Sequence, residues 1–457
     1  MNNDINQPKE FDAVLGGGAS PPVDGLVLGG SKGVKNRLQS SNLEVQIMAI
    51  SEALNYGKPG LDLVLKILVQ SPPKVQRLIA QLLREKGGIE GKQFLLSYNP
   101  WLFFTTLLDW NKNDFFSNKV TSVEIFSRVK PTLKLKLSAS KQLAISHRFG
   151  KRSKIDSQVR IMRNPGELKN SLENAQCEAL EALICEINWQ HLINRQGDCE
   201  ALEALRREVN WQHLINRQGD CSEPNDMYDF SNILVKDYQK FPNLKALFLG
   251  DVTDFTLGTK YASKIYLCNI YPILEAFSKL EVLHLSGQFG STKNILVHSK
   301  QLKVNNLKTL IIERADFTDN RIAKICEHEY PSLEYLELWL CRKNTTKIVD
   351  ILSPILSGQA CPNLLYLGLI GSMHTHEIIR AIATSPIIKR LKVLDLRGGN
   401  LREISAITSN IAEFNNLHTL NISENRLKVS KVKVLSQLKC QLIAYGQSPD
   451  RYYPGCE

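Results

Sequence analysis

The stretch "LEYLEL", from Leu333 to Leu338, decides the fold, because its pattern L-x-x-L-x-L returns along the second half of the chain. The other copies are LKALFL from Leu244, LEVLHL from Leu280, LKTLII from Leu307, LLYLGL from Leu364, LKVLDL from Leu391 and LHTLNI from Leu417. Successive copies begin 36, 27, 26, 31, 27 and 26 residues apart. The apolar-polar alternation at the end of each copy is typical of a strand with one buried face.

This phrase and this period are those of leucine-rich repeats. Helical patterns separate the copies, as in "TTKIVDILSPILSG" (345–358) and "HEIIRAIATSP" (376–386). We therefore predict an α/β leucine-rich-repeat solenoid over residues 222–457, right-handed, with a parallel sheet on its concave side. Two copies complete a longer signature, and their Cys341 and Asn425 are expected to hydrogen-bond loop backbone.

The residues between the leucines should face the concave side of the sheet. The candidate partner-binding residues in these columns are Phe248, His284, Tyr335, Glu337, Trp339, Tyr366, Ile370, Asp395 and Arg397. Aromatic residues and Arg in a central patch are typical of binding hot spots. The sequence thus predicts that a protein partner binds here; the alternative is that its own neighbours cover Trp339.

Residues 1–33 are rich in Gly and Pro, and their "GGGASP" run (16–21) does not match a phosphate-binding spacing. Residues 34–110 show apolar positions three and four apart, which predicts helices. Two of these helices should end at Gly57 and Gly87, and Pro59 should open a third between them.

The phrases "GVKNRL", "SEALNYGKPGLDLVL", "VQRLIAQLLRE" and "YNPWLFF" in the first quarter of the chain resemble a HEAT-like module that opens many cyanobacterial proteins. The resemblance implies an all-α module of stacked helical hairpins, but no particular activity. A HEAT-like pigment lyase, or another enzyme accessory, remains an alternative function.

Residues 111–170 carry 14 Lys and Arg against 4 Asp and Glu, whereas the rest of the chain is nearly neutral. Alternating residues over 130–163 predict strands, and their order, ending in "VRIMRNPGEL", resembles one degenerate blade of a WD-type propeller. We interpret the segment as a small sheet or a basic linker. Weak polyanion contact, or nucleic-acid association, is the alternative.

Residues 171–221 contain a tandem duplication, in which Glu178–Cys199 and Glu200–Cys221 differ at three positions. In each copy leucines recur near one helical face, and we predict one helix per copy, in a tolerant spacer. The His and Cys spacings within the copies do not match closed zinc sites.

No sequence motif indicates a catalytic, metal or cofactor site, and we predict a protein that is not an enzyme. "SMHTHE" (372–377) places His374 and His376 in a loop without a third well-placed ligand. The ten cysteines show no C-x-x-C, no apolar run is long enough to span a membrane, and the N-terminus lacks a secretory pattern. We expect a cytoplasmic protein without membrane contact.

Several phrases of the second half, "LFLGD" (247–251), "YPILEAF" (271–277) and "PSLEYLELWL" (331–340), resemble a family of uncharacterised bacterial leucine-rich-repeat proteins that are often joined to a WGR domain. This chain has no W-G-R tripeptide. The resemblance therefore implies the repeat fold, and our leading hypothesis is a scaffold or adaptor that binds a protein partner.

Overall fold

The computed structural model of the chain describes residues 30–40, 42–104, 159–162, 165–173, 180, 182–187, 226–252, 266–267, 269–289, 301–313, 318–340 and 344–449. The chain forms two compact units, Met1–Phe104 and Thr105–Glu457. Most of the basic segment 111–170, the second copy of the duplication and Cys341 lie outside the described residues. None of the described helices combines the length and the apolar character needed to cross a membrane.

The first unit is helical. Its elements are α1 (Gly30–Leu38), α2 (Leu43–Ala53), η1 (Leu54–Tyr56), α3 (Gly57–Gln70), α4 (Pro73–Lys86), α5 (Gly88–Tyr98) and η2 (Pro100–Leu102). Apolar side chains at helical spacing, such as Val64 and Leu68 on α3 and Ile79 and Leu83 on α4, are fully buried. This burial stabilises the unit by about 1.5–3 kcal/mol per large side chain.

Glycines shape the joints of this unit. Gly57 adopts φ +64° between η1 and α3, so the helix that Pro59 was expected to open begins two residues earlier. Gly87 follows α4, as predicted. At Gly60 a Cβ would lie 1.8 Å from the Ala53 carbonyl oxygen, so α3 approaches α2 only because this side chain is absent. The helical module is observed; its HEAT-like character stays a prediction.

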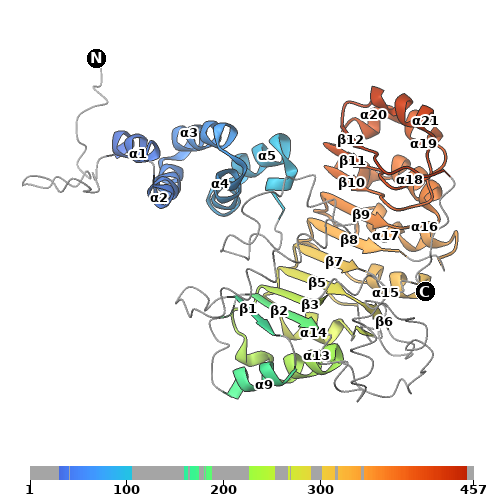
Figure 1. Cartoon of the computed structure of the whole chain (residues 1–457), viewed down its shortest axis with the longest axis horizontal. Helices are drawn as coiled ribbons and strands as arrows, with labels where there is room; N and C mark the ends of the chain where they lie inside the picture. Colours follow the sequence, from blue (N-terminus) through green and yellow to red (C-terminus); the bar gives the residue numbers. More distant parts are fainter. Residues whose placement is uncertain are drawn as a thin grey trace, which may run out of the picture. The chain divides into compact units, whose positions relative to one another are not determined.

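The second unit is built on one ten-stranded sheet, in which every pair of neighbours is parallel. Its strands, in spatial order, are β1 (Val159–Met162), β2 (Ala182–Ile187), β3 (Ala246–Val252), β5 (Val282–Ser286), β7 (Thr309–Glu313), β8 (Tyr335–Trp339), β9 (Tyr366–Ile370), β10 (Val393–Asp395), β11 (Thr419–Asn421) and β12 (Gln441–Ile443). A second, two-stranded sheet pairs β4 (Tyr266–Leu267) with β6 (Gln288–Phe289). Spatial order follows chain order, as repeats stacked one on the next require (Figure 1).

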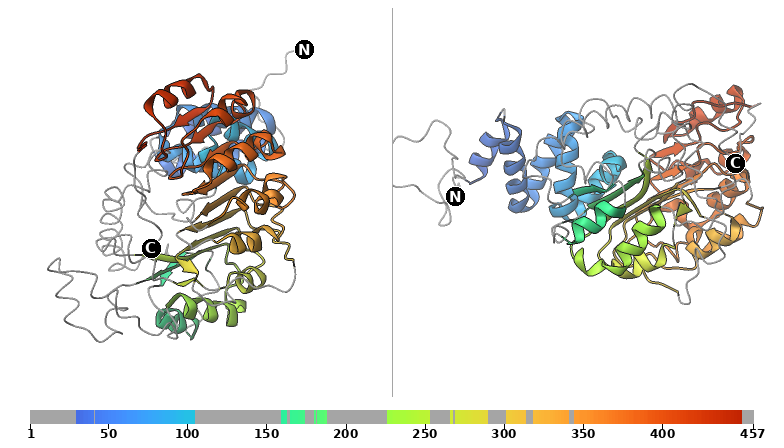
Figure 2. Two further views of the ribbon diagram at one scale, coloured as in Figure 1. Left: turned by 90° about the vertical axis from the view of Figure 1, so that its right-hand side faces the viewer. Right: turned by 60° about the horizontal axis from the view of Figure 1, so that its bottom comes forward.

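Helices between the strands line one face of the large sheet (Figures 1 and 2). They are α9 (Pro165–Glu173), α13 (Asp226–Lys236), η4 (Tyr238–Lys240), α14 (Tyr271–Ala276), α15 (Asp319–Cys326), α16 (Ile348–Ile351), α17 (Ser353–Leu356), α18 (Thr375–Thr384), η7 (Pro386–Lys389), α19 (Ser405–Thr408), α20 (Ile411–Phe414), α21 (Val429–Val434) and η8 (Leu435–Gln437). None of these described helices lies on the other face of the sheet, which we call the helix-free face. Strand-plus-helix repeats on a parallel sheet are the leucine-rich-repeat-like architecture that the sequence predicts.

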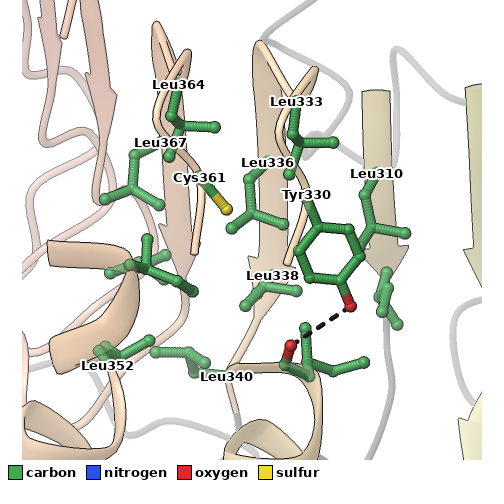
Figure 3. Packing of buried hydrophobic residues seen from close by; sticks show 14 of the residues in the cluster. Leu310, Tyr330, Leu333, Leu336, Leu338, Leu340, Leu352, Cys361, Leu364 and Leu367 are labelled. Atoms are coloured by element: carbon green, nitrogen blue, oxygen red, sulfur yellow. Dashed lines mark hydrogen bonds between the residues drawn. The ribbon is translucent and has the colours of Figure 1, made fainter. Parts of the chain in front are cut away.

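The repeated leucines form the core between sheet and helices, as expected. In the copy on β8, Leu333, Leu336 and Leu338 are at most 1% exposed. Figure 3 shows them in one core with Leu364 and Leu367 of the next repeat and with Tyr330, whose hydroxyl donates to the Ile325 carbonyl at 3.3 Å. The phrase therefore encodes both the strand and its buried face.

The strand ends turn through a recurring left-handed position. Gly371 follows β9 with φ +77° and Gly398 occupies the same place one repeat later with φ +70°. In the next repeat Glu424 takes this conformation with φ 56°. Beside it, Asn425 donates to the Leu396 carbonyl at 2.8 Å and accepts from the Leu401 N–H at 2.9 Å, which confirms its predicted role in holding the loop.

Two predictions about the centre of the chain are wrong. Residues 182–187, expected to be helical within the first copy of the duplication, form strand β2. Residues 159–162 form a strand as predicted, but β1 pairs parallel with β2 instead of belonging to a small separate sheet. The solenoid sheet therefore begins well before residue 222, and α1 likewise begins before residue 34.

The first copy becomes a strand because it carries a variant of the repeated phrase, with Cys185 in place of the last leucine. Leu180, Leu183 and Cys185 are all fully buried, and β2 is paired on both sides, by β1 and β3. The burial of these three side chains and the pairing of β2 on both edges outweigh the weak helical propensity of the segment. The reading L-x-x-L-x-C was the signal in the sequence.

Candidate functional site

A polar cluster on the helix-free face is centred on Glu337, in the middle of β8. Its Oε1 accepts hydrogen bonds from Trp339 Nε1 at 2.8 Å and from Arg397 Nη2 at 2.9 Å. Its Oε2 accepts one from the Tyr335 hydroxyl at 2.8 Å. We call Tyr335, Glu337, Trp339, Tyr366, Asp395 and Arg397 the Glu337 cluster.

Asp395 of β10 is the second carboxylate of the cluster. The Arg397 guanidinium pairs with its Oδ2, and the Arg397 backbone N–H donates to its Oδ1 at 3.1 Å. The Tyr366 hydroxyl lies 3.1 Å from Asp395 Oδ2 and 3.2 Å from Glu337 Oε2. Since a hydroxyl has one proton, Tyr366 donates to only one of these carboxylates at a time.

The aromatic rings of the cluster are packed as well as hydrogen-bonded. Tyr335 and Tyr366 stack with their ring centroids 3.7 Å apart and an interplanar angle of 3°. The Arg397 guanidinium lies 5.8 Å from the centroid of the Trp339 ring, within cation–π range. Three adjacent strands thus hold one another's side chains in a single arrangement.

Gly368 of β9 makes this arrangement possible. It is aligned with Glu337 on one side and Asp395 on the other. A Cβ at this position would lie 3.0 Å from the Tyr366 ring and 3.1 Å from Glu337 Cγ. Gly368 was not among the predicted site residues, although a glycine inside a strand is a known signal of close approach.

Burial dominates the electrostatics of the cluster. It raises the pKa of Asp395, an effect that Arg397 opposes and Glu337 reinforces. Burial also raises the pKa of Tyr335 and Tyr366 well above the usual value for tyrosine. Both tyrosines are therefore neutral donors at physiological pH, and one guanidinium serves two carboxylates.

The predicted exposure of the site residues is largely wrong. Phe248, His284, Glu337, Tyr366, Ile370, Asp395 and Arg397 are between 0% and 8% exposed. Large side chains on adjacent strands shield one another, because neighbouring strands are only about 4.8 Å apart. Tyr335 and Trp339 remain half-buried, with Ile311 and Glu313 of β7 beside them. Those two β7 residues are not among the predicted binding residues.

Phe248 and His284 lie apart from the Glu337 cluster. Their rings meet edge to face with centroids 6.1 Å apart. His284 Nε2 lies 2.9 Å from Glu313 Oε1 on the adjacent strand β7. The predicted single patch is therefore two groups. Half-buried Glu313 connects the second group, Phe248 and His284, to the accessible part of the helix-free face.

In the "SMHTHE" stretch His374 Nδ1 lies 3.9 Å from Glu377 Oε2, but the two histidines do not come together. His374 Nε2 contacts the Asn344 carbonyl at 2.8 Å, whereas His376, on α18, contacts Arg380 Nη2 at 2.8 Å. Among the described residues, no three His, Cys, Asp or Glu side chains gather closely enough to hold a metal ion.

The polar atoms of the Glu337 cluster point toward one another, so the site is suited to non-covalent contact. Trp339 and Tyr335 each commit their polar atom to the buried Glu337, which leaves ring surface for contact with solvent or a partner. Such side chains are preorganised, since hydrogen bonds already fix their rotamers.

No protein-family model matches the chain. No curated protein matches it either. Among solved structures, it is similar to a protein from Bacteroides fragilis, with 19% identity and a TM-score of 0.45 over 70% of this chain and 85% of that one. It is also similar to a leucine-rich-repeat protein from Leptospira interrogans, with 17% identity and a TM-score of 0.30 over 59% of this chain and 56% of that one.

Proposed function

We propose that the protein is a non-enzymatic scaffold that binds a protein partner on the helix-free face of its sheet, between β7 and β8. The contact surface consists of the half-buried residues Ile311, Glu313, Tyr335 and Trp339. One observation carries the proposal: two partly exposed aromatic side chains, on either side of Glu337 along β8, are each hydrogen-bonded to its buried carboxylate.

The physical reason is entropic. Ordering a side chain at an interface costs about 0.5–1.5 kcal/mol, and this cost is small when the rotamer is fixed beforehand. Trp and Tyr are enriched among interface anchors because they combine a large apolar area with few rotatable bonds. A parallel sheet of ten strands adds a rigid base beneath them.

The proposal places the protein in a reducing compartment such as the cytoplasm. The four cysteines in the described part of the chain, Cys185, Cys326, Cys361 and Cys440, are buried and form no disulfide bond. Free buried thiols are typical of proteins that fold without disulfides.

Photo-crosslinking tests the proposal directly. A photoreactive amino acid replaces Ile311 in the full chain, and in a control it replaces Tyr238, which is 41% exposed on η4. We expect a specific crosslinked protein from position 311 and not from position 238. The Trp339→Ala variant should lose this crosslink, with its circular dichroism unchanged. A partner that crosslinks from both positions, or whose capture survives Trp339→Ala, would place binding elsewhere.

A further inference from the structure

A second candidate site is a pocket at the amino-terminal ends of the central strands, with a volume of about 460 Å³. Lys308, Glu334 and Lys392 line it, and each directly precedes a strand, β7, β8 or β10. Lys389 and Arg390, at the end of η7, complete its charged lining. The stacking of the repeats thus brings four cations and one carboxylate to one edge of the sheet.

Three of the four cations have no carboxylate partner among the residues that the structure describes. Lys308 pairs with Glu281 at 2.7 Å. Over the described ranges, no ion pair reaches Lys389, Arg390 or Lys392. The charge of Lys392 also acts on His418: burial, and then this charge, lower the pKa of the His418 imidazole.

The guanidinium of Arg390 is held in place by its neighbours. Its Nη1 donates to the Pro362 carbonyl at 2.8 Å. Its guanidinium lies against Gly358, where a Cβ would come within 1.8 Å of Nη2. Its Nε and Nη2 are buried and have no hydrogen-bond partner in the described part of the chain. Gly358 does not line the pocket, so Arg390 contributes its fixed positive charge to the site and not these two buried donors.

We propose that this pocket binds a polyvalent oxyanion, with a phosphate group as the chemistry that fits best. The fixed guanidinium of Arg390 and the ammonium groups of Lys389 and Lys392 supply three positive charges that attract an anion carrying more than one negative charge. The volume lies within the range of small-ligand sites. Glu334 is the acidic member of the lining and opposes the anion. The pocket is independent of the helix-free face and of the function proposed for it.

Isothermal titration calorimetry of the full chain with pyrophosphate, at constant ionic strength, tests this site. Lys392→Gln should weaken binding, and Glu334→Gln should strengthen it, each by roughly fivefold, the effect of one charge contact in a solvated site. Lys433→Gln, on exposed α21, is the matched control and should leave affinity unchanged. A general effect of net charge would make Lys433→Gln weaken binding as much as Lys392→Gln does, so this control separates the pocket from the overall charge.

The outcomes separate this site from other basic parts of the chain. Absence of binding, or binding that neither pocket substitution changes, would overturn the proposal. A phosphoserine peptide and its unphosphorylated form distinguish the source of the phosphate. If the phosphopeptide binds more tightly than pyrophosphate, with the same dependence on Lys392 and Glu334, the phosphate is carried by a protein. If it does not, the ligand is a small phosphate compound.

Discussion

The tandem duplication allows a test of why one copy is a strand. Deleting Glu200–Cys221 or deleting Glu178–Cys199 gives two chains of identical length. They differ only where Ile184, Cys185 and Ile187 of the first copy are replaced by Arg, Arg and Val of the second. We expect the first deletion to leave stability nearly unchanged and the second to be strongly destabilising.

The expected difference follows from the position of Cys185 in β2. This residue is fully buried in the core cluster beside Leu183. An Arg there would bury a charge without a partner, which costs at least about 3 kcal/mol. Replacing Ile187 by Val adds roughly 0.5–1.5 kcal/mol. We therefore expect the two deletion variants to differ by about 3–6 kcal/mol.

Chemical denaturation followed by circular dichroism measures this difference, and hydrogen exchange of residues 159–187 shows where it arises. Since β1 pairs with β2, the unstable variant should lose protection in both strands. Equal stability and equal protection of the two deletion variants would refute the reasoning, because Cys185 would then not require an apolar environment. A loss of stability in the first deletion variant would show that the second copy also packs on the core.

Three further predictions concern single residues. Leu338→Ala should lower the free energy of unfolding by about 2–5 kcal/mol, measured by urea denaturation, because it leaves a cavity; Trp339→Ala, which removes a half-buried ring, should cost less. Glu424→Gly should raise the free energy of unfolding by roughly 0.5–1 kcal/mol, because Glu424 adopts the left-handed φ of 56°, which favours glycine. Burial acts against ionised Asp319, but hydrogen bonds from Thr345 and Asn344 outweigh it and lower its pKa. Its stabilisation should therefore be full above its ordinary pKa near 3.8 and be lost as pH falls through the lower folded value, and acid titration of Asp319→Asn should lack this loss.

Much of the fold is determined by local sequence. The phrase beginning at Leu333 encodes a strand and its buried face, because alternation places every second side chain on the same side. Its repetition requires stacking, since one repeat cannot bury its own apolar face. The role of Asn425 and the alternation between Leu338 and Trp339 could be predicted for the same reason.

The tertiary structure determined the features that depend on residues from other repeats. Residues 182–187 have a helical pattern in isolation, and become a strand because β1 and β3 offer their hydrogen bonds on both sides. The exposure of Tyr366 and Asp395 depended on which side chains stand on adjacent strands, and their hydrogen bonds join residues about 30 positions apart. Local periodicity determines which way a side chain points; only the stacked repeats determine what lies above it.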